Sequence, residues 1–511
     1  MKPSLVAIVV ASSLIAVPLY AQRTDHARAP SSSSSSGYVS NSDDYVHLVK
    51  GKHEASILND GSSALDMRLA MIDRAQKSIS IESYIFNADQ AGCLVLSALV
   101  KKAREMKGKN FQVHLLIDKQ ILGPVIDPYF VDELANEGIE LRYYNTAAVP
   151  NVAVNHRNHK KTFTIDAGTP NGEVIVGGRN IADNYFDLAE KNNFSDTDVH
   201  VQGPAVDTVQ KIFDGFWGSP QVGTIARPDR PQLSPVVPTR NGPDVTARDR
   251  SRYMVKQWDA SVAKVNACLE STPTKDKLRK SIAVKASAVH HTTTTVDSIL
   301  VASDGPDWKQ KDRGWGSEIL KQIDGAKKKV LIENPYIMLI DKPREIVDKK
   351  LAQGVKVDVV VNSRLKNDEF SMVTMALYNA KYVAGKKGGG AYLYKGENKK
   401  FQVPGVKYSD DALWATHAKT MVVDDKNSYI GSGNFDPRSL DRINSEIGFV
   451  FPDNPEFAAQ LNATIQNRMK NSTRIDGDGR DPSGVKVETP NYLNVFPFLK
   501  IGTLSLFKDQ L

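Results

Sequence analysis

Cysteine is scarce in this sequence, since only Cys93 and Cys268 occur among its 511 residues. The chain also has no CxxC and no HExxH pattern, so the sequence gives no support for a zinc site. Two isolated cysteines set no disulfide framework, although an exported protein could join them. Cys93 stands in the apolar helical pattern AGCLVLSALV, which favours a small core residue.

Long runs of one charge are absent as well. The formal net charge is +7, with 41% hydrophobic and 24% charged residues, which is typical of a globular protein. The positive balance mildly favours anionic partners such as phosphates, nucleic acid or an anionic membrane surface. No apolar run after residue 21 is long enough to span a membrane. We therefore expect contact with a bacterial membrane surface only through the N-terminal segment or the C-terminal tail.

The N-terminus, MKPSLVAIVVASSLIAVPLYAQ, predicts a secretory signal peptide with cleavage after Ala21. Leu19 is larger than the residue usually found three positions before such a cut, so an uncleaved anchor remains the alternative. The following polar segment, RTDHARAPSSSSSSG, cannot bury a core and predicts a disordered tether. These features favour an exported, periplasmic protein that is peripheral to the membrane or anchored in it.

Two distant segments of the chain resemble each other. LAMIDRAQKSISIES (69–83) aligns without a gap with LKQIDGAKKKVLIEN (320–334), and each predicts an amphipathic helix followed by a short strand. Each copy then predicts another helix and an apolar strand, at 111–118 and at 355–362. This alternation predicts an α/β fold of two similar lobes from an internal duplication, each a mixed sheet flanked by helices.

The composition divides the chain into seven parts. Six prolines between residues 219 and 244 indicate an extended connector, and helical periodicity follows it. HHTTTT (290–295) reads as a turn or the start of a strand. The predicted parts are a signal peptide or anchor (1–21), the tether (22–44), a first lobe (45–218), the connector (219–250), a helical insert (251–300), a second lobe (301–480) and an apolar tail (481–511).

Each lobe contains the pattern HxKxxxxD. HKKTFTID contains His159, Lys161 and Asp166, and HAKTMVVD contains His417, Lys419 and Asp424. The composition predicts about 0.06 chance matches to this pattern, so two matches at corresponding places indicate a shared site. Residues two apart on a strand point to the same side, so each His and Lys should project together. We expect each Asp at a strand end, where it holds that end and the two lobes together.

Glycine-rich turns ending in Asn follow both motifs, GGRN (177–180) and GSGN (431–434). Acidic residues then occur in FSDTDVHV (194–201) and RINSEIGFV (442–450). With these features the sequence resembles the phospholipase D superfamily. NFDPRSLDRINSEIG is similar to the bacterial cardiolipin synthase-like branch in particular. The resemblance covers roughly residues 60–205 and 315–465 and implies an active site at the lobe interface, with no metal or other cofactor.

The residue types suit phosphodiester chemistry. One neutral imidazole can attack phosphorus to form a phosphohistidine, and one protonated imidazole can give its proton to the departing alcohol. By resemblance we expect His159 to attack and His417 to act as the general acid. The remaining site residues have expected roles in charge neutralisation (Lys161, Lys419, Asn180 and Asn434), in orienting the histidines (Glu446 for His417, and Asp198, or alternatively Asp196, for His159) and in substrate binding (Gly178, Ser432, His156 and Arg157).

The predicted function is a phosphatidyltransferase or phospholipase D that acts on membrane phospholipids. Transfer to an alcohol would give a product such as cardiolipin, and transfer to water would give phosphatidic acid. A nuclease is the less favoured alternative, because nuclease members of the superfamily are usually short and carry one motif per chain. The sequence also lacks a basic stripe with interleaved aromatics, so nucleic acid is not the expected partner. A non-catalytic scaffold is disfavoured by the two intact motifs.

Overall fold

The computed structural model describes residues 45–119, 126–146, 156–239, 242–244, 246–307, 314–363, 370–396, 401–440 and 444–487. The predicted signal peptide, the tether and most of the apolar tail lie outside these residues. None of the described helices is both long and apolar enough to cross a membrane.

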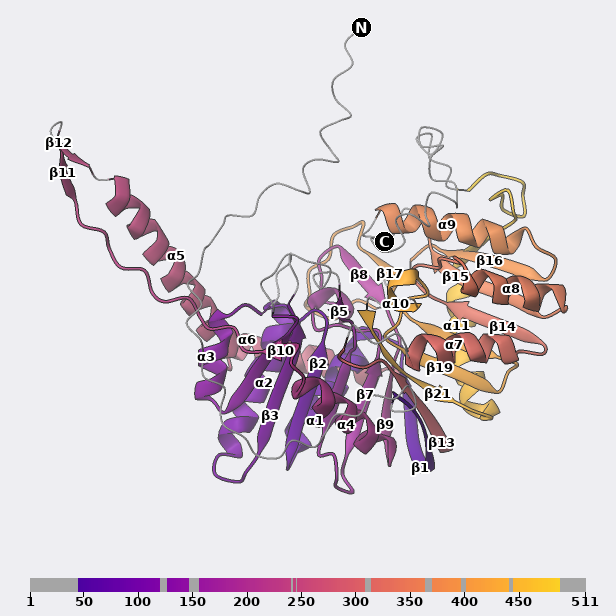
Figure 1. The fold of residues 1–511 in the computed structure, drawn as a ribbon, viewed down its shortest axis with the longest axis horizontal. Coiled ribbons are helices and arrows are strands. Elements are labelled where there is room, and N and C mark those ends of the chain that lie inside the picture. The colour runs from indigo at the N-terminus through magenta and orange to yellow at the C-terminus, as the bar shows by residue number, and fades with distance from the viewer. Residues whose placement is uncertain are drawn as a thin grey trace, which may run out of the picture. The chain divides into compact units, whose positions relative to one another are not determined.

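Within the described residues, the two lobes share one sixteen-stranded sheet (Figure 1). The first lobe contributes β1 (Val46–Leu58), β2 (Ser78–Ser83), β3 (Gln112–Asp118), β4 (Ile139–Tyr144), β6 (Thr162–Ile165), β7 (Glu173–Gly177), β9 (Asp198–Gln202) and β10 (Val222–Gly223). The second lobe contributes β13 (Thr293–Ser303), β14 (Lys329–Glu333), β15 (Lys356–Asn362), β16 (Gly389–Tyr394), β18 (Thr420–Val423), β19 (Asn427–Gly431), β21 (Ile447–Phe451) and β22 (Ser472–Ile475).

The strand order is symmetrical about its centre. It runs β10-β4-β3-β2-β6-β7-β9-β1 in the first lobe and β13-β21-β19-β18-β14-β15-β16-β22 in the second. β1 and β13 pair antiparallel in the middle, in a register from Val46 opposite Ala302 to Ser56 opposite Thr293. In each lobe three strands are parallel and the others antiparallel. The predicted duplication and mixed sheets are confirmed, and the two sheets are joined into one.

The helices repeat in the same order. The first lobe has α1 (Gly61–Arg74), α2 (Gln90–Glu105), α3 (Tyr129–Asn136), the short turn η3 (Asp183–Tyr185) and α4 (Ala205–Trp217). The second lobe has α7 (Gly314–Gly325), α8 (Lys342–Ala352), α9 (Phe370–Ala384), α10 (Pro437–Leu440) and α11 (Pro455–Lys470). The aligned repeats 69–83 and 320–334 thus form the end of α1 or α7 and the strand that follows it.

The core lies on both faces of the sheet because apolar residues alternate along its strands. Ile175 of β7 belongs to the cluster that packs under α1 and α2, whereas its neighbours Val174 and Val176 belong to another cluster. That second cluster includes apolar residues of α4 and α11 and strands of both lobes. Burial of apolar side chains from both lobes in one layer holds the lobes together.

Two predicted boundaries shift in the structure. HHTTTT leads into β13, which begins at Thr293, so the second lobe starts before residue 301. The insert consists of α5 (Thr246–Leu269) and α6 (Pro273–Ser287), so its first helix begins inside the predicted connector. Before α5, the described residues of the connector form β10 and the small hairpin of β11 (Val237–Thr239) and β12 (Gly242–Asp244).

Cys93 and Cys268 form a disulfide, which joins α2 to α5 across a Cα–Cα distance of 4.7 Å. The interpretation of Cys93 as only a small core residue is therefore wrong. The pairing depends on the packing of α5 against α2, and no spacing of two cysteines in the sequence encodes that packing.

Candidate active site

Two short parallel strand pairs hold each motif against the other lobe. β5 (Arg157–Asn158) pairs with β20 (Asn444–Ser445), and β17 (Leu413–Thr416) pairs with β8 (Asn192–Ser195). The pairing continues into the motifs, because the His159 N–H donates to Ser445 O and the His417 N–H donates to Ser195 O, both at 3.0 Å. His159 and Lys161 therefore lie in the link between β5 and β6, not within one strand as predicted.

These pairings place the carboxylate that follows each strand beside the histidine of the other lobe. Glu446 follows β20, and its Oε1 lies 2.8 Å from Nδ1 of His159. Asp196 follows β8, and its Oδ2 lies 2.7 Å from Nδ1 of His417. The predicted partners, Glu446 for His417 and Asp198 for His159, are wrong because strands of different lobes pair here. Asp198 instead forms a buried ion pair with Arg68 at 2.9 Å.

Each carboxylate fixes its histidine by occupying Nδ1, so Nε2 is the ring atom left for chemistry. Glu446 also accepts hydrogen bonds from the hydroxyls of Ser432 at 2.6 Å and Ser439 at 2.7 Å. Asp196 accepts one from its neighbouring backbone, the Thr197 N–H, at 2.7 Å. Both carboxylates are fully buried, and attraction to their histidines lowers the pKa of each against the opposing effect of burial.

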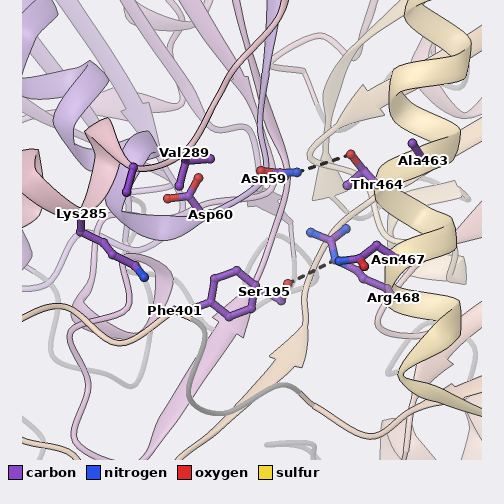
Figure 2. Close-up of a pocket in the computed structure, with 11 residues that line it drawn as sticks. Asn59, Asp60, Ser195, Lys285, Val289, Phe401, Ala463, Thr464, Asn467 and Arg468 are labelled. Carbon is purple, nitrogen blue, oxygen red and sulfur yellow. Dashed lines mark hydrogen bonds between the residues drawn. The ribbon is translucent and has the colours of Figure 1, made fainter.

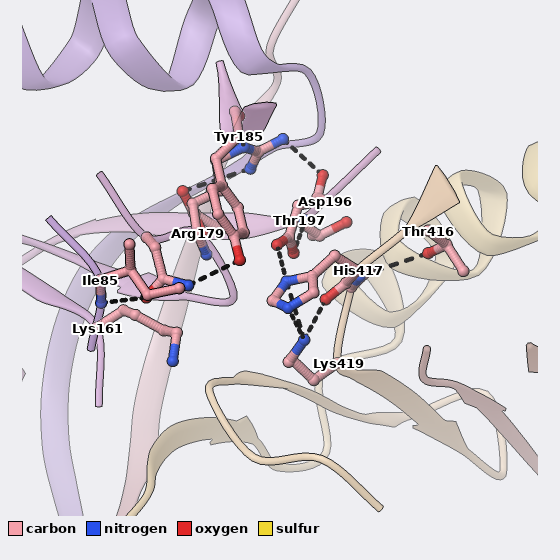
Figure 3. A network of polar contacts seen from close by, with 12 residues as sticks. Ile85, Lys161, Arg179, Tyr185, Asp196, Thr197, Thr416, His417 and Lys419 are labelled. Atoms are coloured by element: carbon pink, nitrogen blue, oxygen red, sulfur yellow. Dashed lines mark hydrogen bonds and ion pairs between the residues drawn. The ribbon is translucent and has the colours of Figure 1, made fainter. Parts of the chain in front are cut away.

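The two motif lysines approach from different lobes. Nζ of Lys161 donates to His159 O and Nζ of Lys419 donates to His417 O, each at 2.5 Å. Nζ of Lys419 also lies 3.0 Å from Nδ1 and 3.1 Å from Nε2 of His417. Figure 3 shows Lys161 and Lys419 with Tyr185 and His417 beside them. Burial lowers the pKa of Lys161 to about 7, opposed by Glu446 and assisted by Lys419.

Burial also lowers the pKa of both histidines. The pKa of His159 falls to about 4, mainly through desolvation, and Lys161 and Lys419 contribute to the decrease. The pKa of His417 falls for the same reason, with further lowering by Lys419 and Lys161. Since lysines of both lobes act on both rings, the two motifs share one electrostatic environment. The prediction of a site at the lobe interface is confirmed.

Aromatic rings enclose the imidazoles. Tyr84 meets His159 edge-on with 4.9 Å between ring centroids, and Tyr185 meets His417 in the same way at 5.1 Å. Phe194 lies at 5.0 Å from the His417 ring. These contacts limit ring rotation and exclude water, which strengthens the electrostatic interactions inside the site.

The motif aspartates hold strand ends, as predicted. Asp166 accepts hydrogen bonds from the N–H groups of Gln76, Lys77 and Ser78 at 2.7–3.1 Å. Asp424 accepts equivalent bonds from residues 327–329 at 2.7–2.9 Å. All these donors belong to the same lobe as the aspartate, so the prediction that the aspartates also join the lobes is wrong.

Gly178 and Ser432, one in each glycine-rich turn, support the carboxylates that orient the histidines. A Cβ on Gly178 would lie 2.4 Å from Oδ1 of Asp196, so glycine leaves the space that this carboxylate needs. Ser432 is fully buried, donates to Glu446 and accepts from the Ile447 N–H at 3.0 Å. Both residues were predicted to bind substrate, and their contacts are instead with the residues that orient the histidines.

The two turn asparagines differ. Asn180 accepts from the Ile85 N–H at 3.1 Å and donates to the Tyr185 hydroxyl at 2.8 Å, so its amide supports the tyrosine beside His417. One N–H of the amide is used in this bond, and its predicted contact with phosphate oxygens stays untested. The Asn434 Oδ1 is buried and makes no hydrogen bond among the described residues, and the predicted contact of this amide with phosphate oxygens stays untested.

Arg157 and His156, which were predicted to bind substrate, also differ in their contacts. Arg157 is buried, donates to Lys119 O at 3.0 Å and lies 3.4 Å from Asp118. Its guanidinium therefore supports the chain before the motif, contrary to the predicted headgroup contact. His156 is half-buried, and its carbonyl accepts from the Asn145 amide at 3.0 Å, while its predicted role in binding stays untested.

Sequence reasoning missed Arg468, which lies behind the His417 unit. All five guanidinium N–H groups have acceptors: the hydroxyls of Ser195 and Thr197, the backbone carbonyl of Asp196 and the carboxylate of Glu333. An arginine near the end of an amphipathic helix looks like a surface residue in the sequence. The sequence contains one signal for it. Glu333 repeats Glu82 as a charged residue in an apolar strand, and a buried charge needs a partner.

Glu333 and its counterpart Glu82 differ in their partners. Glu333 accepts from the Thr416 hydroxyl at 2.6 Å and from Arg468 at 2.7 Å. Glu82 accepts from the Asn158 amide at 2.6 Å, and Nζ of Lys160 lies 4.0 Å away. Thr416 and Asn158 each directly precede a motif histidine, so both glutamates secure the chain next to the reacting residues.

A cavity of about 470 Å³ lies on the other side of Arg468 and Ser195. Figure 2 shows Lys285 and Phe401 across from Thr464, Asn467 and Arg468 of α11. No motif histidine or lysine lines it, so it is separate from the reacting groups. Among the described residues, no group of three His, Cys, Asp or Glu side chains is placed to hold a metal ion.

Comparison with known proteins identifies the family of this chain. The family described as "Cardiolipin synthase, PLD-like domain" matches residues 69–217 and 319–469, which together cover more than half of the chain. The chain belongs to this family. Both matched ranges contain one motif, one turn and the carboxylate that reaches the other lobe. The protein is accordingly an enzyme of the phospholipase D superfamily.

Individual relatives are more distant. Cardiolipin synthase C of Escherichia coli (strain K12) is 27% identical over 435 residues, which cover 78% of this chain and 80% of that protein. An uncharacterized protein of Helicobacter pylori is 26% identical over 83% of this chain and 81% of its own length. The solved phosphatidylserine synthase of Haemophilus influenzae matches with a TM-score of 0.58 at 14% identity, covering 89% of this chain and 92% of that one. This last similarity concerns the fold.

Proposed function

We propose that this enzyme cleaves the phosphodiester of a membrane phospholipid and transfers the phosphatidyl group to the hydroxyl of an alcohol, as a cardiolipin synthase does. The observation that carries the proposal is the pair of buried His–carboxylate units, one from each motif, in one site with two lysines. A phosphodiester needs one group to attack phosphorus and another to protonate the leaving oxygen, and this site offers both.

In the first step, Nε2 of His159 attacks phosphorus. The new P–N bond replaces the P–O bond to the departing alcohol, and His417 gives that oxygen a proton from its Nε2. In the second step, the acceptor hydroxyl gives its proton to His417 and attacks phosphorus, and the P–N bond breaks. The products are a new phosphodiester and the original His159.

The assignment of His417 as the acid is supported by its carboxylate. Asp196 accepts hydrogen bonds from one side chain, His417, and from the Thr197 N–H. Glu446 divides its charge among His159, Ser432 and Ser439. A carboxylate with fewer hydrogen-bond donors stabilises an imidazolium better. Asp196 therefore suits His417 to the role of the acid, which must hold a proton. Binding of the anionic phosphate between the lysines favours the same protonated form.

An exported, periplasmic location at the membrane is part of the proposal. The N-terminal pattern of a signal peptide supports it, and so does the disulfide between Cys93 and Cys268, because such bonds persist in oxidising compartments. Transfer to water, which would give phosphatidic acid, is the alternative outcome at the same site.

The test is product identification by mass spectrometry. The enzyme is incubated with phosphatidylglycerol, phosphatidylethanolamine or DNA, each with and without a chelator. We expect a product with two phosphatidyl groups from phosphatidylglycerol, unaffected by the chelator and lost in His159→Ala and His417→Ala. Phosphatidic acid alone would assign a hydrolase, cut DNA would contradict the proposal, and complete loss with chelator would contradict the metal-free mechanism.

A further inference from the structure

The insert between the lobes carries an arm that stands away from the sheet. The N-terminal part of α5 and the β11–β12 hairpin extend away from the body, beyond α3 and α6 (Figure 1). The other end of α5 is fixed, because Val265, Cys268 and Leu269 are buried and Cys268 is bonded to α2. The arm therefore has one firmly anchored end and one exposed end.

The exposed end presents apolar and basic side chains together. Arg250, Tyr253, Met254 and Gln257 follow the spacing i, i+3, i+4 and i+7, so they share one face of the helix, and all four are exposed. Tyr253 is 64% exposed and Met254 37%. We call these four residues the α5 face.

Large apolar side chains are concentrated at this end. Leu233 is 51% exposed, and the N–H of the next residue, Ser234, donates to Ser251 Oγ on the first turns of α5. Leu233, Tyr253 and Met254 are three of the seven large apolar side chains that are exposed in the described part of the chain. Such a concentration marks a contact surface better than scattered exposed residues do.

The charge around the α5 face is positive. Residues 227–264 contain eight Lys or Arg and four Asp, a net charge of +4 out of +7 for the whole chain. Some of these charges are paired, as Arg230 is with Asp259 at 2.8 Å. Arg250 and Lys256 form no ion pair with any described residue. A basic helix with aromatic and apolar side chains on one face is suited to an anionic lipid surface.

We propose that the α5 face docks on anionic phospholipid headgroups, with Tyr253 and Met254 entering the interface and Arg250 contacting phosphates. This inference rests on the proposed function, because it supplies the surface from which phospholipid substrates would be taken. It assigns membrane contact to a part of the insert, whereas the sequence pointed only to the two ends of the chain.

The test measures how deeply one residue of the full chain enters the lipid layer. Tyr253→Trp is compared with Val284→Trp on α6, a matched control because Val284 is 65% exposed. Both are made with His417→Ala, so that turnover cannot alter the lipids. Quenching of tryptophan fluorescence is measured with vesicles of lipids whose acyl chains carry bromine. One set of vesicles contains phosphatidylglycerol and phosphatidylcholine, and the other contains phosphatidylcholine alone. The protein with native tryptophans gives the background.

We expect quenching of Tyr253→Trp to exceed that of Val284→Trp about threefold with phosphatidylglycerol, and to disappear without it. Adding Arg250→Glu should reduce it to the Val284→Trp level, while the same charge change at Lys280 on α6 should not. Equal quenching at the two positions, or quenching that survives Arg250→Glu, would overturn the proposal. Burial of Tyr253 by a second copy, seen as a dimer in sedimentation, would also overturn it. Since binding is measured without turnover, a failed activity assay leaves this result unaffected.

Discussion

In the first lobe, the motif histidine lies against a glutamate that two serine hydroxyls also contact, and the glutamate behind the motif faces a lysine at 4.0 Å. In the second lobe, the histidine lies against an aspartate, and a buried arginine links the backbone of that aspartate to the glutamate behind the motif. The histidine, the lysine and the carboxylate are repeated, while the groups behind them differ. The duplicated frame thus supplies two similar histidine units in different surroundings.

The largest expected effects come from the carboxylates. We expect Asp196→Asn and Glu446→Gln to lower kcat about 10³-fold each, since each loses the acceptor that fixes a histidine tautomer. Asp198→Asn should act on stability rather than on kcat, because its partners are the buried guanidinium groups of Arg68 and Arg179. Steady-state kinetics and thermal unfolding of the three variants separate these effects. An Asp198 variant with the lowest kcat of the three would contradict the observed pairing.

Removal of the disulfide tests whether the insert between the lobes contributes to stability alone or also to the chemistry. Cys93→Ser with Cys268→Ser should lower the free energy of unfolding by about 2–5 kcal/mol, because the bond constrains the unfolded chain. The residues of both histidine units lie outside α2 and α5, so kcat at low temperature should change less than twofold. Denaturant unfolding and kinetics of the double variant provide the measurement. A large fall in kcat without loss of stability would link the insert to the chemistry.

The groups behind the motifs should differ in importance. Arg468→Met should lower kcat about 30-fold and shift the pH dependence of kcat, because Arg468 links the Asp196 backbone to Glu333, which holds Thr416 next to His417. Lys160→Met should lower kcat less than fivefold, because Lys160 lies 4.0 Å from Glu82 and over the Phe216 ring, where one ammonium replaces the five-donor network of Arg468. Arg468→Lys should restore only part of the activity, since lysine cannot match a five-donor network. Equal effects of Lys160→Met and Arg468→Met would remove the distinction between the lobes.

The buried histidines predict a dependence of stability on pH. The pKa of His159 is about 4 when folded, below its ordinary value of 6.5, so the unfolded chain takes up the proton first. The stabilisation is complete above about pH 6.5 and is lost as pH falls toward 4. Between pH 7 and 5 this histidine should cost about 2 kcal/mol. Thermal unfolding should therefore show a smaller fall in Tm over this range for His159→Asn than for the unmodified enzyme.

Some parts of this picture follow from the sequence and others do not. The two motifs and the helix–strand repeats are local patterns that occur twice, so comparing the copies identified the lobes and the residues His159 and His417. The histidine partners depend on short strand pairs between residues more than 200 positions apart, for example Thr416 with Ser195. No local pattern encodes such pairs. Arg468 was missed and the pairing of Cys93 with Cys268 was left open for a related reason, because their partners are set by how α11 and α5 pack.

The central claim is that Asp196 serves the acid, His417, while Glu446 serves the nucleophile, His159. It is tested by mixing enzyme with phospholipid carrying labelled phosphorus, quenching within one turnover in neutral denaturant, and mapping the labelled peptide. We predict label on His159 in the unmodified enzyme, slower labelling of the same residue in Asp196→Asn because His417 acts in both steps, and no label in Glu446→Gln. Label on His417, or accumulation in Glu446→Gln with none in Asp196→Asn, would contradict it.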